Sequence, residues 1–145
     1  MSPATPREVV EHLLHLTAQG STEAMADVFS EDAVFEMPFL PPGAPQQEPG
    51  REAFRDHLQE DGGLQQFHAV DNVRIHETAD PEVVVTEYRL HGRVLATGKR
   101  FAFAIVMIAR VREGLITWSR SYSNPLDGAI AFGMAGDLLA ALAEA

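Results

Sequence analysis

The stretch EVVVTEYRLHGRVLATGKRFAFAIVMIARVRE, residues 82–113, decides the fold of this chain. It is rich in β-branched and aromatic residues, and it keeps the two-residue period of a β-strand. Thr97-Gly98 divides it and is a turn signal. We therefore predict strands over 82–96 and 99–113. The connection between them is too short for a crossover helix, so the two strands must be antiparallel.

The same period continues on both sides of this pair. We predict further strands over 67–79 and 115–124, bounded by the turn signals Asp80-Pro81 and Glu113-Gly114. All these connections are short, so the four strands should form one antiparallel sheet. A fifth, shorter strand is predicted over 33–37, where the stretch VFEMPFLPP (34–42) runs into prolines.

Helices are predicted at both ends of the chain. Thr5, Pro6 and Glu8 carry the signature of a capped helix start, and Gly20 ends that helix. A second short helix follows over 21–30 and should form a hairpin with the first. A third is predicted from residue 51 to the glycines at 62 and 63, and one last helix over 126–145.

Length and composition limit the functions that are open to the chain. Its 145 residues fit a single domain, 1–145, and its formal charge of −10 opposes a phosphate-binding surface for nucleic acid. It has no cysteine, no apolar run long enough for a membrane span, and no signal-peptide pattern at its start. We expect a soluble cytoplasmic protein without nucleic-acid or membrane partners.

Helices followed by a long antiparallel sheet make an α+β fold. Long strands that bend around a helical hairpin can leave a cone that is open at one end. A cavity of this kind suits a small apolar ligand.

The order of these elements resembles the nuclear transport factor 2-like superfamily, over nearly the whole chain. It is most similar to the SnoaL-like and limonene-epoxide-hydrolase-like branches. The segments that carry the resemblance are FSEDAVFEMPFLPP (29–42), GREAF (50–54), VVVTEY (83–88), ATGKRF (96–101) and REGLITWSRSYSNP (112–125). The resemblance implies a cone-shaped curved sheet wrapped around the N-terminal helical hairpin, a cystatin-like roll, with a C-terminal helix. Such proteins include isomerases, polyketide cyclases, epoxide hydrolases and members without catalysis.

The resemblance also allows the positions of known catalytic groups to be compared. The base of ketosteroid isomerases falls on Met37, and their oxyanion donors fall near Leu16 and Met107, none of which can serve. Strand alternation puts Phe35 and Met37 on the pocket face, and it turns Glu36 away from the pocket. Steroid-type isomerisation is therefore not expected.

Two other groups of relatives give a similar result. The Arg and the two Asp residues of the epoxide hydrolases fall on Tyr88, Leu90 and Ser121. A catalytic Glu of the phenazine-pathway members also falls on Ser121, whereas their helix histidine falls on His57. His57 is therefore the matched position that keeps an acid or base.

The third helix places Phe54, His57, Leu58 and Asp61 on one face. A carboxylate four residues after a histidine can orient it as a general base near neutral pH. The alternative is an ion pair at the rim that only stabilises the helix.

Side chains of the last strand alternate between two environments. By the resemblance, Ser119 and Ser121 face the cavity, whereas Arg120 and Tyr122 lie on the outer face, where relatives dimerise. Glu87 is the expected cross-strand partner of Arg120.

We therefore predict a small-molecule enzyme that isomerises, cyclises or hydrates an apolar ring-containing metabolite by acid/base chemistry. We expect neither a cofactor nor a metal, and a homodimer through the outer sheet face. The alternatives are a binding protein for an apolar molecule without catalysis, and a structural dimer with a filled cone. The candidate catalytic residues are His57, Asp61 and Tyr88, and the candidate substrate contacts are Phe35, Met37, Phe54, Leu90, Met107, Ser119 and Ser121.

Overall fold

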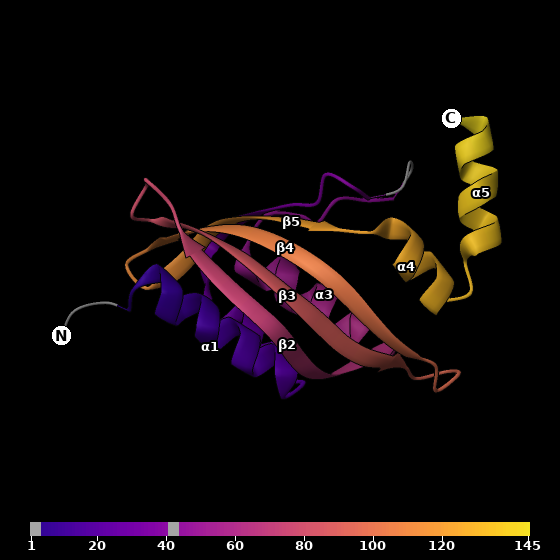
Figure 1. Cartoon of the computed structure of the whole chain (residues 1–145), viewed down its shortest axis with the longest axis horizontal. Coiled ribbons are helices and arrows are strands. Elements are labelled where there is room, and N and C mark those ends of the chain that lie inside the picture. Colours follow the sequence, from indigo (N-terminus) through magenta and orange to yellow (C-terminus); the bar gives the residue numbers. More distant parts are fainter. Residues whose placement is uncertain (1–3, 41–43) are drawn as a thin grey trace.

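The predicted α+β architecture is confirmed by the computed structural model, which describes residues 4–40 and 44–145 (Figure 1). In chain order the elements are α1 (Pro6–Ala18), α2 (Thr22–Ala26), β1 (Phe29–Glu36), α3 (Arg51–Asp61), β2 (Gln65–Glu77), β3 (Val83–Val94), β4 (Arg100–Arg112), β5 (Leu115–Ser123), α4 (Pro125–Ala131) and α5 (Ala135–Glu144). None of the helices in these ranges is long and apolar enough to cross a membrane.

One five-stranded sheet has the order β1-β5-β4-β3-β2. Strands β2 to β5 form the predicted antiparallel run, and β1 joins its edge parallel to β5. The β2–β3 register shifts twice, and Asn72 beside one shift has a positive φ of 52°. Irregularities of this kind bend and twist a strand, which helps the sheet to curve around the helices (Figure 1).

The N-terminal helix begins as predicted. The Thr5 side chain accepts a hydrogen bond from the Glu8 backbone N–H at 3.2 Å, and the Glu8 carboxylate accepts one from the Thr5 N–H at 3.1 Å. This capping box satisfies two backbone donors at the start of α1. Gly20, with a φ of +71°, follows the end of the helix.

The first strand is longer than predicted and begins at Phe29 rather than residue 33. Its early part pairs with β5, where the Ile116 N–H donates to the Val28 carbonyl at 2.9 Å. This pairing joins segments that lie far apart in the sequence, so the local pattern of the segment does not reveal it.

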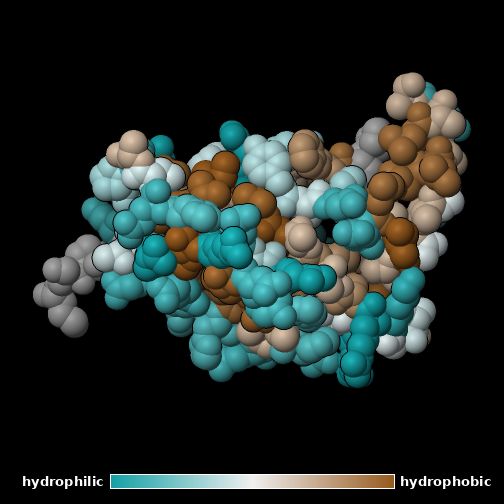
Figure 2. Space-filling model, in the orientation of Figure 1, coloured by the Kyte–Doolittle hydropathy of each residue, from teal (hydrophilic) through white to brown (hydrophobic). Residues whose placement is uncertain are grey.

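The predicted C-terminal helical segment is confirmed, but it forms two helices and not one continuous helix. Asn124 caps α4 by accepting the Leu126 N–H at 2.9 Å. Gly133, with a φ of +70°, then breaks the helical run before α5. Figure 2 shows apolar side chains gathered on this end of the molecule, where Ile130, Met134 and Leu139 are exposed.

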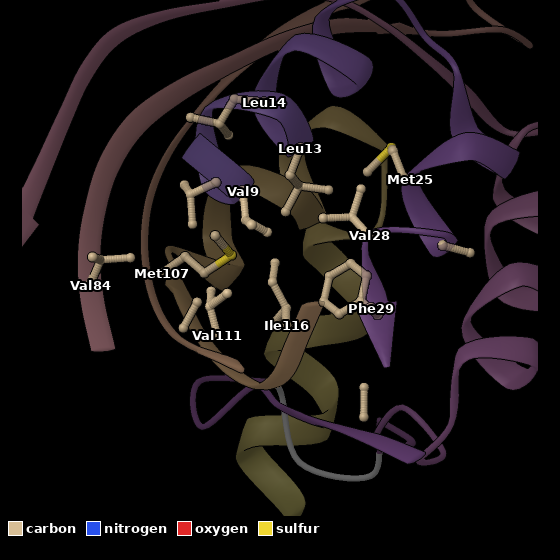
Figure 3. Close-up of a cluster of buried hydrophobic side chains, with 14 of the residues drawn as sticks. Val9, Leu13, Leu14, Met25, Val28, Phe29, Val84, Met107, Val111 and Ile116 are labelled. Atoms are coloured by element: carbon tan, nitrogen blue, oxygen red, sulfur yellow. The ribbon is translucent and has the colours of Figure 1, made fainter. Parts of the chain in front are cut away.

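Two apolar clusters hold the helices against the sheet. The larger one packs side chains of α1, α2 and β1 against Val84, Met107 and Ile116, as Figure 3 shows. The smaller one lies toward the other end of β3 and β4, where Val94 and Phe101 meet Ala131 of α4. The two clusters therefore bury opposite ends of the concave side of the sheet.

Gly92 lies at the closest approach in the smaller cluster. A β-carbon there would stand 2.5 Å from Cζ of Phe101 and 2.6 Å from the Gln66 carbonyl oxygen. The Phe101 ring stacks on Phe103, with ring centroids 4.3 Å apart, so it is held in place.

We expect Gly92→Ala to lower the free energy of unfolding by about 1–3 kcal/mol, because the added methyl must displace a packed ring or a strand. The measurement is urea denaturation followed by circular dichroism. Gly136→Ala is the matched control, since its new β-carbon in α5 would meet no atom within 4 Å. A Gly92→Ala protein as stable as the wild type would contradict this account of the cluster.

Candidate functional site

A cavity of about 590 Å³ lies on the concave side of the sheet. This volume is above the ~300 Å³ at which ligand pockets begin, so the filled-cone alternative is not favoured. We call it the central cavity. Its lining comes from all three N-terminal helices and all five strands, and includes Leu13, Leu14, Thr17, Met25, Phe29, Phe35, Met37, Phe54, His57, Phe67, Tyr88, Leu90, Met107, Ser119 and Ser121.

Three aromatic rings form one wall of the central cavity. Phe29 and Phe35 come from β1 and Phe54 from α3, with ring centroids 4.6–5.0 Å apart. Tilted and edge-on arrangements at these distances are favourable for aromatic pairs. Leu90 and Met107 are buried in the sheet opposite α1 and add further apolar surface. A ligand in this cavity would mainly meet hydrocarbon.

Helix α3 is fixed by polar contacts at its start and along its length. The Gly50 N–H donates to the Ala33 carbonyl at 2.8 Å, which ties the start of the helix to β1. Arg55 donates to the Asp27 carboxylate at 2.6 Å and to the Glu23 carbonyl at 3.0 Å, which ties the helix to α2. These contacts hold the face of α3 that carries Phe54 and His57 toward the cavity.

His57 and Asp61 form the expected pair, with His57 Nε2 3.0 Å from Asp61 Oδ2. The His57 side chain lines the cavity at its rim and is 50% exposed, whereas Asp61 is 31% exposed and does not line the cavity. Partial burial raises the pKa of Asp61, against the attraction of His57. With Nε2 bound to Asp61, Nδ1 is the ring nitrogen left for a ligand. Asp61 can therefore act only through His57.

Tyr88 lies on the sheet wall of the central cavity. Burial raises the pKa of its hydroxyl to about 12, and no charged neighbour or hydrogen bond among the described residues contributes to this shift. At neutral pH the group is therefore a neutral hydrogen-bond donor and not a base.

Ser119 and Ser121 form a small polar patch on the β5 side of the cavity. Ser119 is buried, and Ser121 lies opposite Met107 in the sheet register. Nine of the ten site residues predicted from sequence thus line one cavity, and Asp61 is the exception. Their roles in binding or catalysis stay predictions.

Glu36 was expected to point away from the pocket, but it borders the central cavity, and its carboxylate is held by Arg120 of β5. Arg120 Nε donates to it at 2.7 Å, and hydrogen bonds from Trp118 and Arg120 lower its pKa. The expected pairing of Arg120 with Glu87 is therefore wrong. Glu87 instead lies 2.7 Å from His76, because the parallel β1–β5 register brings Glu36 and not Glu87 to Arg120.

Sequence reasoning did not find the polar rim of the central cavity. Glu48, Asp56 and Glu60 lie there beside His57. Glu48 belongs to the loop before α3, which has no hydrophobic period to show which way a residue points. Asp56 and Glu60 flank the His57 face of α3, so their helical spacing was the available signal.

Comparison with known proteins shows the family and the fold of this chain. A family model described as the SnoaL-like domain matches residues 10–119. An uncharacterised PhzA/B-like protein of Pseudomonas aeruginosa is 30% identical over 123 residues, which cover 83% of this chain and 84% of the relative.

Solved structures extend the comparison to the fold. A candidate isomerase from Bacillus subtilis has a TM-score of 0.82 at 25% identity, covering 89% of this chain and 93% of its own. A candidate polyketide cyclase from Pseudomonas putida has a TM-score of 0.75 at 18% identity, covering 89% and 98%. These likenesses confirm the predicted nuclear transport factor 2-like roll.

The raised pKa of Tyr88 predicts how stability depends on alkaline pH. The unfolded chain releases this proton near pH 10 and the folded one near pH 12, so stability is full below pH 10 and falls as the pH rises through this window. Raising the pH from 8 to 11 should therefore lower the unfolding free energy of the wild type by about 1.4 kcal/mol more than that of Tyr88→Phe.

The measurement is urea denaturation at both pH values. Tyr122→Phe is the matched control, because it removes the other tyrosine of the chain, which is not in the central cavity. Equal losses in the wild type and in Tyr88→Phe would show that Tyr88 is not the buried phenol described above.

Proposed function

Because the chain belongs to the SnoaL-like domain family, we propose that it is an enzyme that moves a proton on an apolar ring-containing metabolite without a cofactor. The reaction class is isomerisation, cyclisation or hydration. The observation that carries the proposal is His57, the one histidine in the lining of the central cavity among the described residues, with Asp61 3.0 Å from its Nε2.

In this mechanism His57 is the general acid or base. Nδ1 takes a proton from a carbon next to a substrate carbonyl, and the imidazolium later returns a proton to the rearranged or cyclised product. Asp61 is a positioning residue that holds the ring through Nε2 and stabilises its charged form. His57 therefore returns the proton that it removed, and the enzyme ends each cycle in its starting protonation state.

Tyr88 supplies the complementary role in the same proposal. Its neutral hydroxyl donates a hydrogen bond to the carbonyl oxygen as negative charge builds up there. Ser121 is a second polar contact on the neighbouring wall. The aromatic wall of Phe29, Phe35 and Phe54 favours a ring-shaped substrate, because aromatic rings stack and pack edge to face.

A non-catalytic binding protein is the second candidate, and a specific observation favours it. Met37, Leu90 and Met107 line the cavity at the positions where the resemblance puts the acids and bases of other members. A cavity wall that has lost those groups fits storage or transport of an apolar molecule. A ligand that co-purifies with the protein and is returned unchanged would support this candidate.

Proton abstraction can be measured without knowledge of the natural substrate. We expect the protein to catalyse exchange of the acidic C–H protons of 2-tetralone, an apolar cyclic ketone, in deuterated buffer. Loss of a general base costs about 10²–10⁴ in rate, so His57→Gln should slow the exchange at least 100-fold. Asp61→Asn should have a smaller effect and should shift the pH profile, because it acts on the histidine. The readout is deuterium incorporation by mass spectrometry.

His12→Gln is the matched control, since His12 is exposed on α1 and does not line the central cavity. It should exchange at the wild-type rate. Exchange that is unaffected by His57→Gln, or that is absent from a wild-type protein which binds the ketone, would overturn the catalytic proposal in favour of binding.

We further propose a homodimer through the outer sheet face. Val85, Val106 and Ile108 alternate with the buried residues Thr86 and Met107, so they point outward. No helix in the described ranges covers them. Trp118 lies on the same face with Arg120 stacked over it at 5.0 Å. An apolar strip with charged neighbours is typical of a homodimer interface.

The dimer proposal predicts that Ile108→Arg yields a monomer, because two buried like charges would face each other across the two-fold axis. Sedimentation velocity measures the outcome. Leu95→Arg, in the exposed β3–β4 turn, is the control that keeps the wild-type assembly. A wild-type monomer, or an unchanged Ile108→Arg dimer, would contradict the proposed interface.

A further inference from the structure

A second cavity, of about 420 Å³, adjoins the central one. We call it the annex. It lies between the chain that follows β1, the end of β5, and helices α4 and α5. Met37, Leu40 and Ser121 line both cavities, so the annex and the central cavity share a wall.

The surface of the annex is apolar. Phe39, Phe103, Phe132 and Leu138 supply ring and hydrocarbon surface, and Asp137 is the one charged group in its lining among the described residues. Leu138 is 9% exposed although it comes from the most peripheral helix, so α5 is seated here by its apolar side chain. Apart from Asp137, its polar side chains are Ser121, Ser123 and Asn124, so a polar ligand group would lose its hydration over most of this surface.

The volume of the annex shows whether it is a small packing defect or a cavity large enough to bind a ligand. A cavity of ~150 Å³ lined by apolar groups already takes up a benzene molecule. The annex is nearly three times as large, so it can hold a hydrocarbon chain of several carbons. The two cavities meet at Met37, Leu40 and Ser121, and Ser121 has the smallest side chain of the three.

Negative charge at the rim of the central cavity limits the charge that the ring end of the ligand can carry. Glu48, Asp56 and Glu60 surround the His57 side of the central cavity, and none of the lysines or arginines of the described chain lines it. Like charges repel, so a carboxylate or phosphate on the ring is disfavoured there.

We propose that the annex binds an apolar alkyl or alkenyl tail, and that the ligand of this protein is an uncharged ring compound that carries such a tail. The inference rests on the proposed function in one respect, that the ring occupies the central cavity. It does not need the ring to be turned over. In a substrate of this class the reacting ring lies beside His57, and the tail packs against α4 and α5, which limit its length.

A homologous series of probes tests the tail. The 4-alkylphenols from ethyl to heptyl are competed against the fluorescent neutral probe N-phenyl-1-naphthylamine. Each buried methylene tightens binding roughly fourfold, so wild-type affinity should rise by about that factor per added carbon until the annex is full. Affinity should not follow chain length in a protein whose annex is filled.

Gly128→Phe fills the annex from α4. Gly128 lines the annex, and a β-carbon there meets no atom within 4 Å, so the larger side chain has room to enter. Ala141→Phe fills it from α5 and guards against a fault specific to one helix. Gly136→Phe is the matched control, because its β-carbon is equally unobstructed but Gly136 is outside the annex lining. Circular dichroism confirms that each variant is folded.

We expect the chain-length dependence in the wild type and in Gly136→Phe, and its loss in both filled variants, with heptylphenol bound at least tenfold more weakly than by the wild type. Three results would overturn the proposal: no chain-length dependence in the wild type, the same dependence in the filled variants, or a changed sedimentation coefficient for Gly128→Phe. The last would assign the annex to a second copy of the chain. The proposed enzymatic function can fail separately from the annex proposal. A protein that binds the series with this chain-length dependence but exchanges no proton would support the annex proposal and contradict the enzymatic one.

Discussion

The unbroken pairing of β3 with β4 is the constraint on which the rest of the structure depends. Eleven consecutive residue pairs run from Val83 opposite Arg110 to Arg93 opposite Arg100 without a bulge. Since side chains alternate faces, this register turns Tyr88, Leu90 and Met107 to the concave side together. If β3 slipped by one residue against β4, Tyr88 and Leu90 would turn outward, away from the face that carries Met107, and the charged side chains of Glu87 and Arg89 would enter the core. The cavity wall and the buried core are therefore specified by the same pairing.

Most of the fold could be predicted because its signals are local. The long strands keep a two-residue period, and the first helix carries its own cap at Thr5 and Glu8. The errors concern contacts between distant segments or signals hidden in an apolar run. The parallel β1–β5 pairing, and with it the ion pair of Glu36 with Arg120, joins positions 84 residues apart. The break at Gly133 lies within a sequence that otherwise favours a continuous helix.

The candidate site was predictable for a related reason. Strand alternation and helical spacing assign a residue to a face, and the resemblance says which face is concave. Together these inferences brought nine of the ten residues to one cavity. Asp61 is the exception, because it follows His57 by one helical turn and reaches the histidine rather than the cavity. The rim carboxylates and the annex were missed, since they depend on how the irregular loop before α3 and the C-terminal helices pack.

The break between α4 and α5 has a consequence for how this kind of protein diverges. The SnoaL-like family model matches residues 10–119, and both helices lie after its end. The wall that carries His57 and Tyr88 is thus part of the shared domain, whereas the wall that closes the annex is an appendage joined to it by a few residues. A relative that differed from this chain only in these two helices would keep the wall that carries His57 and Tyr88 and would have a different annex.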